Sequence, residues 1–286
     1  MRTETNQSGV DTPMNSTSDA DVSKILSNAI GRNVHFETSE NMREVANETV
    51  QAVITSPPYW NLKDYKHPEQ IGFHDSYDGY HERLDRVWSE CKRVLRQDGT
   101  MWVVIDKIMQ TEEITHIPYD ITRHCRKLGF LLQDMVVWNK PTAIAGMSPT
   151  NFVNKYEHIV FFSKSRKLKL QMPAVDKKAP PDWMRDSSRL TDIWRFPVKA
   201  GSIRRTPAHE APYPEELVKR IVLLSTDEGD MILDPFLGSG TTVKVALQLN
   251  RDCIGYEINP DFSSVIVDML AGLDPPHRSP RITEFS

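Results

Sequence analysis

Residues Asp234-Pro-Phe-Leu-Gly-Ser-Gly-Thr-Thr242 form a glycine-containing loop between a predicted strand and a predicted helix. The apolar run Met231–Leu233 precedes the loop, and a helix is expected from Thr241 to Leu249. A second apolar run, Cys253–Tyr256, then closes a βαβ unit. In doubly wound α/β proteins a nucleotide-like cofactor binds at such a loop, at the carboxyl end of the strand. The sequence therefore predicts a doubly wound α/β fold with a cofactor-binding loop.

The residues of the loop favour a cofactor without phosphates. A phosphate-binding P-loop has Lys before its Ser or Thr, whereas Gly240 precedes Thr241 here. The dinucleotide pattern G-x-G-x-x-G is also incomplete, because Val243 stands at the third glycine position. S-adenosylmethionine carries a ribose and a charged methionine part but no phosphate, so we expect it as the cofactor.

Two acidic residues are candidates for contacting this cofactor. Glu257 ends the next predicted strand, 19 positions after Gly238, which is close to the spacing at which a carboxylate reaches ribose hydroxyls. Asp234 is a candidate partner for the ammonium of the methionine part. The alternatives are a structural turn that binds no ligand and an NAD site.

A second motif, Ser56-Pro-Pro-Tyr59, follows the predicted buried strand Gln51–Thr55. Prolines cannot continue a central strand, so the chain must turn at the carboxyl edge of the sheet. The amino group of a base is a poor nucleophile, because its lone pair is conjugated into the ring. Ser56 Oγ and a backbone carbonyl held outward by the prolines can accept hydrogen bonds from its two protons. Tyr59 can stack on an extruded base. This pattern predicts direct methyl transfer by positioning, without a covalent enzyme intermediate; the alternative is that the prolines only end the strand and Tyr59 packs in the core.

Helical and strand periodicities alternate between and around these motifs. Helices are predicted over Tyr77–Arg96 and Ile121–Leu128, and strands over Thr100–Ile105, Phe130–Trp138 and His158–Phe162. Further along, Pro214 opens a helix with two glutamates in its first turn. The alternation predicts an α/β protein with a mainly parallel sheet covered by helices.

Length and composition set further limits. The 286 residues suit one α/β catalytic domain with a small insertion, and residues 1–21, rich in Ser, Thr, Asn and Asp, are expected to be a disordered tail. Cys91, Cys125 and Cys253 form no CxxC pair, so we predict buried cysteines without a disulfide framework, and no metal site. There is neither a signal peptide nor an apolar run of membrane-spanning length, so we expect a cytoplasmic protein without a membrane partner.

The segment Ser163–Arg205 has a charge unlike the rest of the chain. It contains twelve Lys or Arg against four Asp, a net charge of +8, whereas the whole chain carries −4 and the remainder therefore −12. Such asymmetry is the electrostatic pattern expected for contacts with nucleic-acid phosphates, with Trp183 and Trp194 available for stacking or packing. The alternative is an ordinary solvated surface.

Taken together, the motifs resemble those of the amino-methyltransferases of bacterial and archaeal restriction-modification systems. Thr55–Trp60 is similar to their catalytic motif and Asp234–Thr242 to their cofactor motif. Because the catalytic motif comes first, the order is similar to that of the permuted β group. His209–Glu216 resembles the segment that enters the cofactor motif, and Ile254–Pro260 resembles the ribose-binding strand. The resemblance covers about residues 34 to 270.

The resemblance implies a Rossmann-like S-adenosylmethionine-dependent methyltransferase with permuted motif order, acting on duplex DNA in the cytoplasm, associated with the nucleoid. It divides the chain into two catalytic-domain halves, 22–162 and 206–286, around a basic target-recognition region, 163–205. A cognate restriction endonuclease acting separately is a further candidate partner. The predicted catalytic residues are Ser56, Pro57, Pro58 and Tyr59. The predicted cofactor-binding residues are Asp234, Pro235, Phe236, Gly238, Ser239, Gly240, Thr241, Thr242 and Glu257.

The resemblance also bears on which base is methylated. Ser in the first position of the tetrapeptide is more common in N4-cytosine enzymes and Asp in N6-adenine enzymes, so Ser56 favours N4 of a flipped cytosine, with N6 of adenine as the alternative. C5-cytosine chemistry is excluded because its Cys nucleophile normally follows Pro, and none of the three cysteines does. A non-catalytic nucleic-acid-binding module would explain the basic segment but not the two motifs together. Asp106 is a candidate acceptor for the departing proton, the alternative being a helix cap or a solvated strand end, and Glu37 occupies a place where Asp would be usual.

Overall fold

The computed structural model describes residues 34–110, 113–141, 152–172, 190–197, 213–271 and 273. The tail predicted over residues 1–21 lies outside the described residues. So do residues 173–189 and 198–205 of the basic segment.

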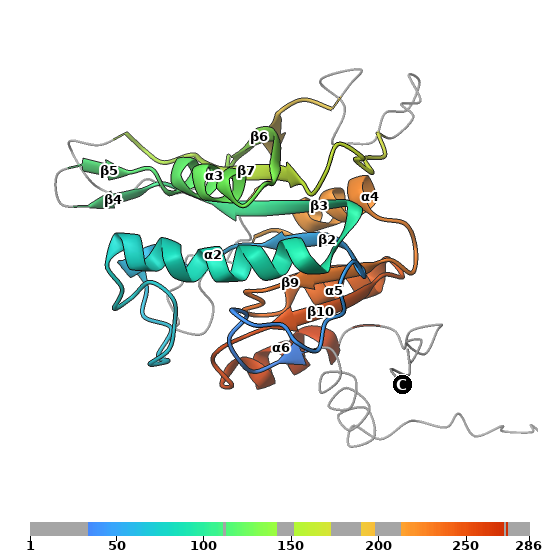
Figure 1. The fold of residues 1–286 in the computed structure, drawn as a ribbon, viewed down its shortest axis with the longest axis horizontal. Helices are drawn as coiled ribbons and strands as arrows, with labels where there is room; N and C mark the ends of the chain where they lie inside the picture. Colours follow the sequence, from blue (N-terminus) through green and yellow to red (C-terminus); the bar gives the residue numbers. More distant parts are fainter. Residues whose placement is uncertain are drawn as a thin grey trace, which may run out of the picture.

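An eight-stranded sheet forms the centre of the molecule, with the strand order β1-β10-β9-β2-β3-β7-β6-β8 (Figure 1). The strands are β1 Val34–His35, β2 Val50–Thr55, β3 Leu95–Ile105, β6 Leu131–Asn139, β7 Tyr156–Ser163, β8 Ile193–Arg195, β9 Met231–Asp234 and β10 Asp252–Tyr256. A separate hairpin pairs β4 Ile108–Gln110 with β5 Glu113–Thr115. The predicted α/β class is confirmed.

Within the described residues, all neighbouring strands of this sheet are parallel except at β7. That strand runs antiparallel to both β3 and β6. The mainly parallel sheet is thus confirmed, but the reversal of β7 was not foreseen. Its consequence is that β7 begins at the edge where the parallel strands end: Ile105, the last residue of β3, pairs with His158.

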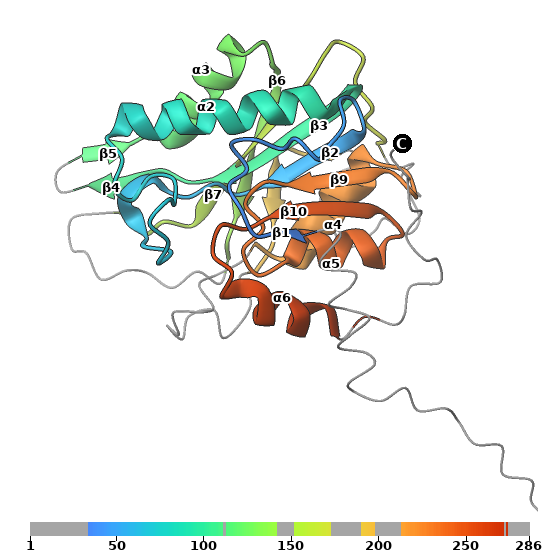
Figure 2. The ribbon, with the colours of Figure 1, turned by 60° about the horizontal axis from the view of Figure 1, so that its bottom comes forward.

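Helices cover both faces of the sheet (Figures 1 and 2). On one face lie α2 Tyr77–Val94 and α3 Ile117–Lys127; on the other lie α4 Glu215–Ser225, α5 Thr241–Gln248 and α6 Phe262–Ala271. A short 3-10 turn, η1 Trp60–Leu62, follows the tetrapeptide. Strand periodicity separates the two apolar cores: Ala52 and Ile54 face the α4 and α5 side, whereas Val53 faces α2. Among the described helices, none has both the length and the apolarity required to cross a membrane.

The three cysteines are buried and unpaired, as the sequence predicted. Burial raises the pKa of each thiol above its ordinary value. They are therefore small core residues in the described part of the chain.

The basic segment contributes to the scaffold in both of its described parts. Ile193–Arg195 forms β8 beside β6, and Trp194 is buried against Trp102 with ring centroids 6.1 Å apart. At the edge where strands β2 and β9 begin, Lys164 Nζ lies 3.2 Å from Glu48 and Lys169 Nζ lies 2.8 Å from Asp230. Trp194 thus packs rather than stacks on a ligand, and these two lysines balance acidic groups of the scaffold.

We predict that Trp194→Ala lowers the free energy of unfolding by about 3–5 kcal/mol, because it removes a large side chain from the core. Ile193→Ala, on the same strand but 57% exposed, is the matched control and should change it by less than about 0.5 kcal/mol. Urea denaturation of both variants measures the difference. Equal effects would mean that β8 does not belong to the sheet.

Candidate functional site

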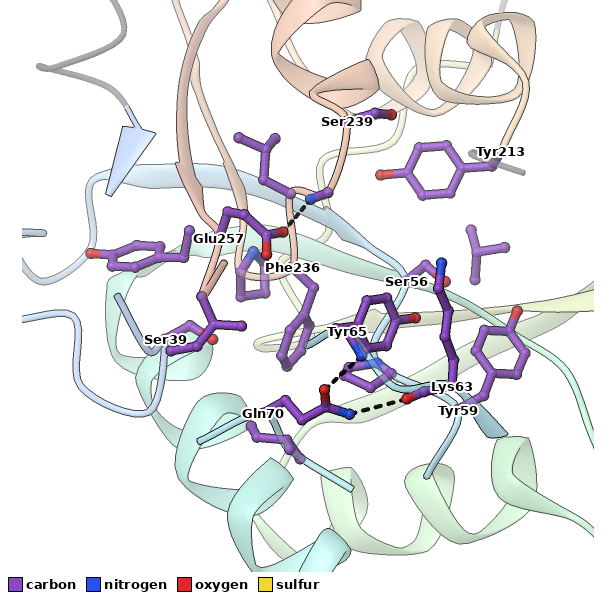
Figure 3. Close-up of a pocket in the computed structure, with 18 of the residues that line it drawn as sticks. Ser39, Ser56, Tyr59, Lys63, Tyr65, Gln70, Tyr213, Phe236, Ser239 and Glu257 are labelled. Carbon is purple, nitrogen blue, oxygen red and sulfur yellow. Dashed lines mark hydrogen bonds between the residues drawn. The ribbon is translucent and has the colours of Figure 1, made fainter. Parts of the chain in front are cut away.

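A cavity of about 680 Å³ lies at the carboxyl edge of the sheet, where both sequence motifs meet (Figure 3). Its walls include the predicted residues Ser56, Pro58, Tyr59, Pro235, Phe236, Gly238, Ser239, Thr241 and Glu257. The remaining predicted residues, Pro57, Asp234, Gly240 and Thr242, are not among its lining residues. The structure therefore brings the two motifs together, with some members forming the wall and others lying behind it.

Asp234 joins the two motifs from behind the wall. Its side chain is fully buried and accepts hydrogen bonds from Thr55 Oγ1 at 2.7 Å and Thr242 Oγ1 at 2.6 Å. Tyr213 donates to it as well, at 2.9 Å. Burial raises the pKa of the Asp234 carboxyl, and the bonds from Thr242 and Thr55 oppose that shift. Because Asp234 lies behind the cavity wall, it is better placed to hold the two motifs together than to contact a cofactor ammonium.

The glycine loop is built around two left-handed residues, Gly238 with φ 54° and Gly240 with φ 91°. A Cβ at Gly238 would meet no protein atom within 4 Å, which agrees with its place in the cavity wall, whereas one at Gly240 would contact Ile266 of α6 at 3.4 Å. The Gly238 amide donates to Glu257 Oε2 at 2.8 Å. The 19-residue spacing thus corresponds to direct contact between the loop and the acidic residue.

Glu257 lines the cavity although it is only 7% exposed. Its second oxygen accepts a hydrogen bond from the Asn259 amide at 2.9 Å. Burial raises the pKa of the carboxyl, and the two amide bonds oppose the shift. The two amides hold the carboxylate at the end of β10, in the wall of the cavity.

The tetrapeptide is anchored to α2 at the base of the same cavity. Tyr80 OH donates to the Pro58 carbonyl at 2.7 Å. Tyr59 lines the cavity and its hydroxyl donates to Glu157 at 3.0 Å, so it is not simply a core residue. Trp60 does not line the cavity. It packs edge-on against Tyr77, with ring centroids 4.9 Å apart.

Several cavity residues come from the start of β7 and the end of β3, and sequence reasoning missed most of them. Glu157 lies on β7, and Lys140 Nζ pairs with its other oxygen at 2.8 Å. Asp106 follows β3; it lines the cavity and accepts bonds from the Lys107 amide at 2.7 Å and from Asn154. No motif marks Glu157, because a residue at the start of a strand reaches the carboxyl edge only if that strand is reversed.

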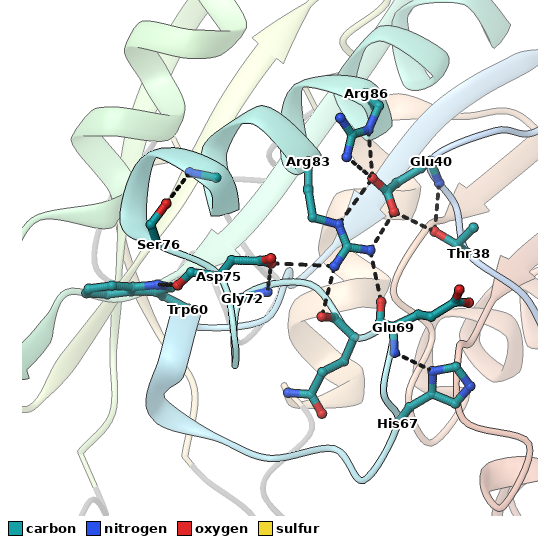
Figure 4. Close-up of polar contacts among 12 residues, drawn as sticks. Thr38, Glu40, Trp60, His67, Glu69, Gly72, Asp75, Ser76, Arg83 and Arg86 are labelled. Atoms are coloured by element: carbon teal, nitrogen blue, oxygen red, sulfur yellow. Dashed lines mark hydrogen bonds and ion pairs between the residues drawn. The ribbon is translucent and has the colours of Figure 1, made fainter.

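Two loops complete the wall, and an ion-pair network on α2 holds both (Figure 4). Arg83 donates to Glu40 at 2.6 Å and to the Gln70 carbonyl at 3.0 Å, and Arg86 pairs with Glu40 at 2.7 Å. Burial alone would raise the pKa of Glu40, but the bonds from Arg83 and Arg86 keep it below its ordinary value. Thr38 Oγ1 donates to Glu40 at 3.1 Å, so the network holds the loop that carries Thr38, and through the Gln70 carbonyl it holds the loop after η1.

The loop after η1 bridges the two halves of the protein. Gln70 binds the Tyr65 amide through Oε1 at 2.6 Å and the Lys63 carbonyl through Nε2 at 3.0 Å (Figure 3). The Tyr65 carbonyl accepts a bond from Asn259 Nδ2 at 2.9 Å. These loop residues carry no recognisable signal beyond their place after the tetrapeptide.

The chain is similar to known proteins in both sequence and architecture. The model of the N6/N4 DNA methylase family matches residues 50–268. The chain is 31% identical over 262 residues to the type II methyltransferase M.Cfr9I of Citrobacter freundii, covering 82% of this chain and 85% of that protein. The structure of a DNA modification methylase of Thermus thermophilus, complexed with S-adenosyl-L-methionine, superposes with a TM-score of 0.59 at 26% identity, covering 84% and 95% of the two chains. The PvuII DNA methyltransferase, cytosine-N4-specific, gives a TM-score of 0.64 at 20% identity over 86% and 88%, a likeness of fold.

The bond between Thr55 and Asp234 gives the site its first test. Thr55→Val keeps the shape of the side chain but leaves a buried carboxylate oxygen without one donor, so we expect the free energy of unfolding to fall by about 1–3 kcal/mol. Thr49→Val is the control, since its exposed hydroxyl binds only the Ala46 carbonyl. Urea denaturation should separate the two variants; a Thr55 variant as stable as the control would show that the bond does not join the motifs.

Proposed function

The chain belongs to the N6/N4 family of DNA methylases, and from this premise we propose that it methylates N4 of a flipped cytosine at a specific site in duplex DNA. One observation carries the proposal: the Ser-Pro-Pro-Tyr motif and the glycine loop open into one cavity. The order of the two motifs supports the permuted β group. Ser56 in the first position supports cytosine, and N6 of adenine is the alternative outcome of the test below.

S-adenosylmethionine is the cofactor, and the cavity offers residues that suit each of its parts. Glu257 is proposed to accept bonds from the ribose hydroxyls, at the end of β10. Phe236, Ile258 and Phe262 supply apolar surface for the adenine ring. Gly238 has no side chain, and the position of a Cβ there is open cavity space. The ligand can therefore approach the backbone closely at this residue. Asp234, Gly240 and Thr242 are proposed to act indirectly, by shaping the loop.

The tetrapeptide is proposed to prepare the amino group of the base. When bound, the cofactor would supply an electrophilic methyl group: its S–CH3 bond breaks as the new N–C bond forms, the thioether S-adenosylhomocysteine is left, and the amino nitrogen gives up one proton. Ser56 Oγ is proposed to accept a hydrogen bond from one of the two amino protons. The second acceptor is proposed to be the Pro58 carbonyl, because Pro58, unlike Pro57, lines the cavity and the bond from Tyr80 occupies only one of its two lone pairs. Asp106, in the same cavity, is a candidate for taking the departing proton.

Tyr59 is proposed to stack on the extruded base. Stacking on an aromatic ring contributes about 1–3 kcal/mol per base, which is comparable to the few kcal/mol that extrusion costs. The basic segment is proposed to contact DNA through residues other than Lys164 and Lys169, which are paired within the scaffold. The type II relatives make a separately acting restriction endonuclease a candidate partner.

Sequencing that distinguishes N4-methylcytosine from N6-methyladenine, applied to DNA from a host expressing the gene, tests the proposal. We expect N4-methylcytosine at one recurring sequence, at a lower level in a host carrying the Ser56→Ala variant and absent from a host without the gene. If N6-methyladenine were found at the recurring sequence instead, the target base would be adenine and not cytosine. The absence of any modified base would reject the proposed activity.

Purified Ser56→Ala should bind the cofactor almost as tightly as the unaltered protein while its kcat falls about tenfold to a hundredfold, because one acceptor for the amino protons is lost. Ser89→Ala is a matched control on α2, where the hydroxyl binds only the Asp85 carbonyl. Calorimetry measures cofactor affinity, and single-turnover methylation measures the rate. If Ser56→Ala lost its affinity for the cofactor, Ser56 would belong to the cofactor site and its proposed role at the base would be wrong.

A further inference from the structure

We propose that Glu157, held by Lys140, is a positioning residue that fixes the Tyr59 ring for stacking on the extruded base. The inference rests on the proposed function, because it concerns the same base site. Neither Glu157 nor Lys140 belongs to the two motifs. Glu157 lies in β7 and Lys140 directly follows β6, so neither is placed by the loops that carry the motifs.

The reversed strand explains why Glu157 reaches this position. Its partner across the pair β6–β7 is Trp138, near the carboxyl end of β6. Trp138 and Glu157 both line the cavity, and Glu157 contacts Tyr59 there. Glu157 is therefore set on rigid sheet backbone, and sites built on strands are more precise than those on mobile loops.

Tyr59 is held at both of its ends. Its backbone lies next to the Pro58 carbonyl, which Tyr80 binds, and its hydroxyl donates to Glu157 Oε2 at 3.0 Å. A tyrosine ring has only two rotatable side-chain bonds. The bond to Glu157 fixes the direction in which the ring points, and because a phenolic O–H lies in the plane of its ring, the position of the acceptor also favours one orientation of that plane. A ring fixed in advance loses little conformational entropy when a base stacks on it.

Lys140 allows the carboxylate to stay in this largely buried position. Its ammonium pairs with Glu157 Oε1 at 2.8 Å, leaving Oε2 for Tyr59. The Lys140 amide also binds the Lys155 carbonyl at 2.7 Å, which fixes the lysine relative to β7. Burial, followed by the charges of Glu157 and Asp106, raises the pKa of Tyr59 well above its ordinary value. The phenol thus keeps its proton and remains a donor at neutral pH.

The network lies away from the glycine loop, so its effect should fall on DNA and not on the cofactor. Figure 3 shows Tyr59 and Glu257 at separate parts of the cavity. Removing the Tyr59 hydroxyl leaves the ring in place but free to turn. The expected result is weaker capture of the flipped base with unchanged cofactor affinity.

A double-mutant cycle tests the proposal on the full-length protein, with a duplex containing the mapped target site. The variants are Tyr59→Phe, Glu157→Ala and their combination, with Glu157→Gln as a variant that keeps an acceptor oxygen. Tyr77→Phe is the matched control: its hydroxyl also donates to a carboxylate, Asp120 at 2.9 Å, but it does not line the cavity. The measurements are KM for DNA, kcat, cofactor affinity, and the fluorescence of 2-aminopurine at the target position.

Each single variant should raise KM for DNA about tenfold, and the combination should raise it no further, because both remove the same hydrogen bond. Glu157→Gln should recover most of the loss. The 2-aminopurine signal should change in the same variants and not in Tyr77→Phe. A lost hydrogen bond that mattered only for stability would lower the melting temperature without moving KM or fluorescence.

Additive effects, or effects equalled by Tyr77→Phe, would overturn the positioning role while leaving methylation by the unaltered enzyme intact. Failure of the proposed function looks different, because the unaltered protein would then methylate no duplex. If Glu157→Ala unfolds, Glu157→Gln and Tyr59→Phe still decide the matter: a shift in KM for DNA in Tyr59→Phe, with Glu157→Gln close to the unaltered enzyme, supports the proposal. Unchanged KM and fluorescence in Tyr59→Phe reject it.

Discussion

The buried hydrogen bond between Thr55 and Asp234 connects two segments that lie 179 residues apart. Thr55 is the last residue of β2 and Asp234 the last of β9, and these strands are neighbours in the sheet. A buried carboxylate is costly unless its oxygens are paired, so the end of β2 and the loop that follows β9 must keep their donors, Thr55 Oγ1 and the Phe236 amide, on Asp234. The same requirement brings Thr242 and Tyr213 to it. The relative position of the two motifs therefore follows from satisfying one buried acid.

The reversed strand has a comparable effect on the other side of the cavity. In a wholly parallel sheet, only strand ends would meet the ligand, followed by loops that vary in conformation. Because β7 runs the other way, its first residues stand beside the ends of β3 and β6. Glu157 is thus fixed in the backbone of the sheet, next to Asp106, where a loop residue would have to be held by further contacts.

Much of this could be predicted from the sequence, and the reasons for the rest are physical. The glycine loop, the Pro-Pro turn and Glu257 are recognisable because their local conformation demands particular residues at particular spacings. Strand direction leaves no such trace, so neither the reversal of β7 nor the position of Glu157 could be read. β8 is only three residues long and lies in a segment dominated by charged residues. Neither the strand nor the burial of Trp194 in it could therefore be predicted from periodicity. The contacts of Asp234 depend on residues far away in the sequence, so its buried position could not be inferred from the motif alone.

Charge read along the chain also differs from charge in the site. Lys164 and Lys169 add to the basic segment in sequence, yet in the structure they neutralise Glu48 and Asp230 at the edge away from the cavity. The cavity itself is lined by five acidic side chains and two lysines (Glu37, Glu69, Asp106, Glu157, Glu257, Lys63 and Lys107). A field of this sign favours a sulfonium cofactor and tolerates a neutral base, but it repels phosphates. For the proposed reaction, the DNA backbone must therefore remain outside the cavity while the base alone enters, which is the physical reason that a fixed stacking surface at Tyr59 matters.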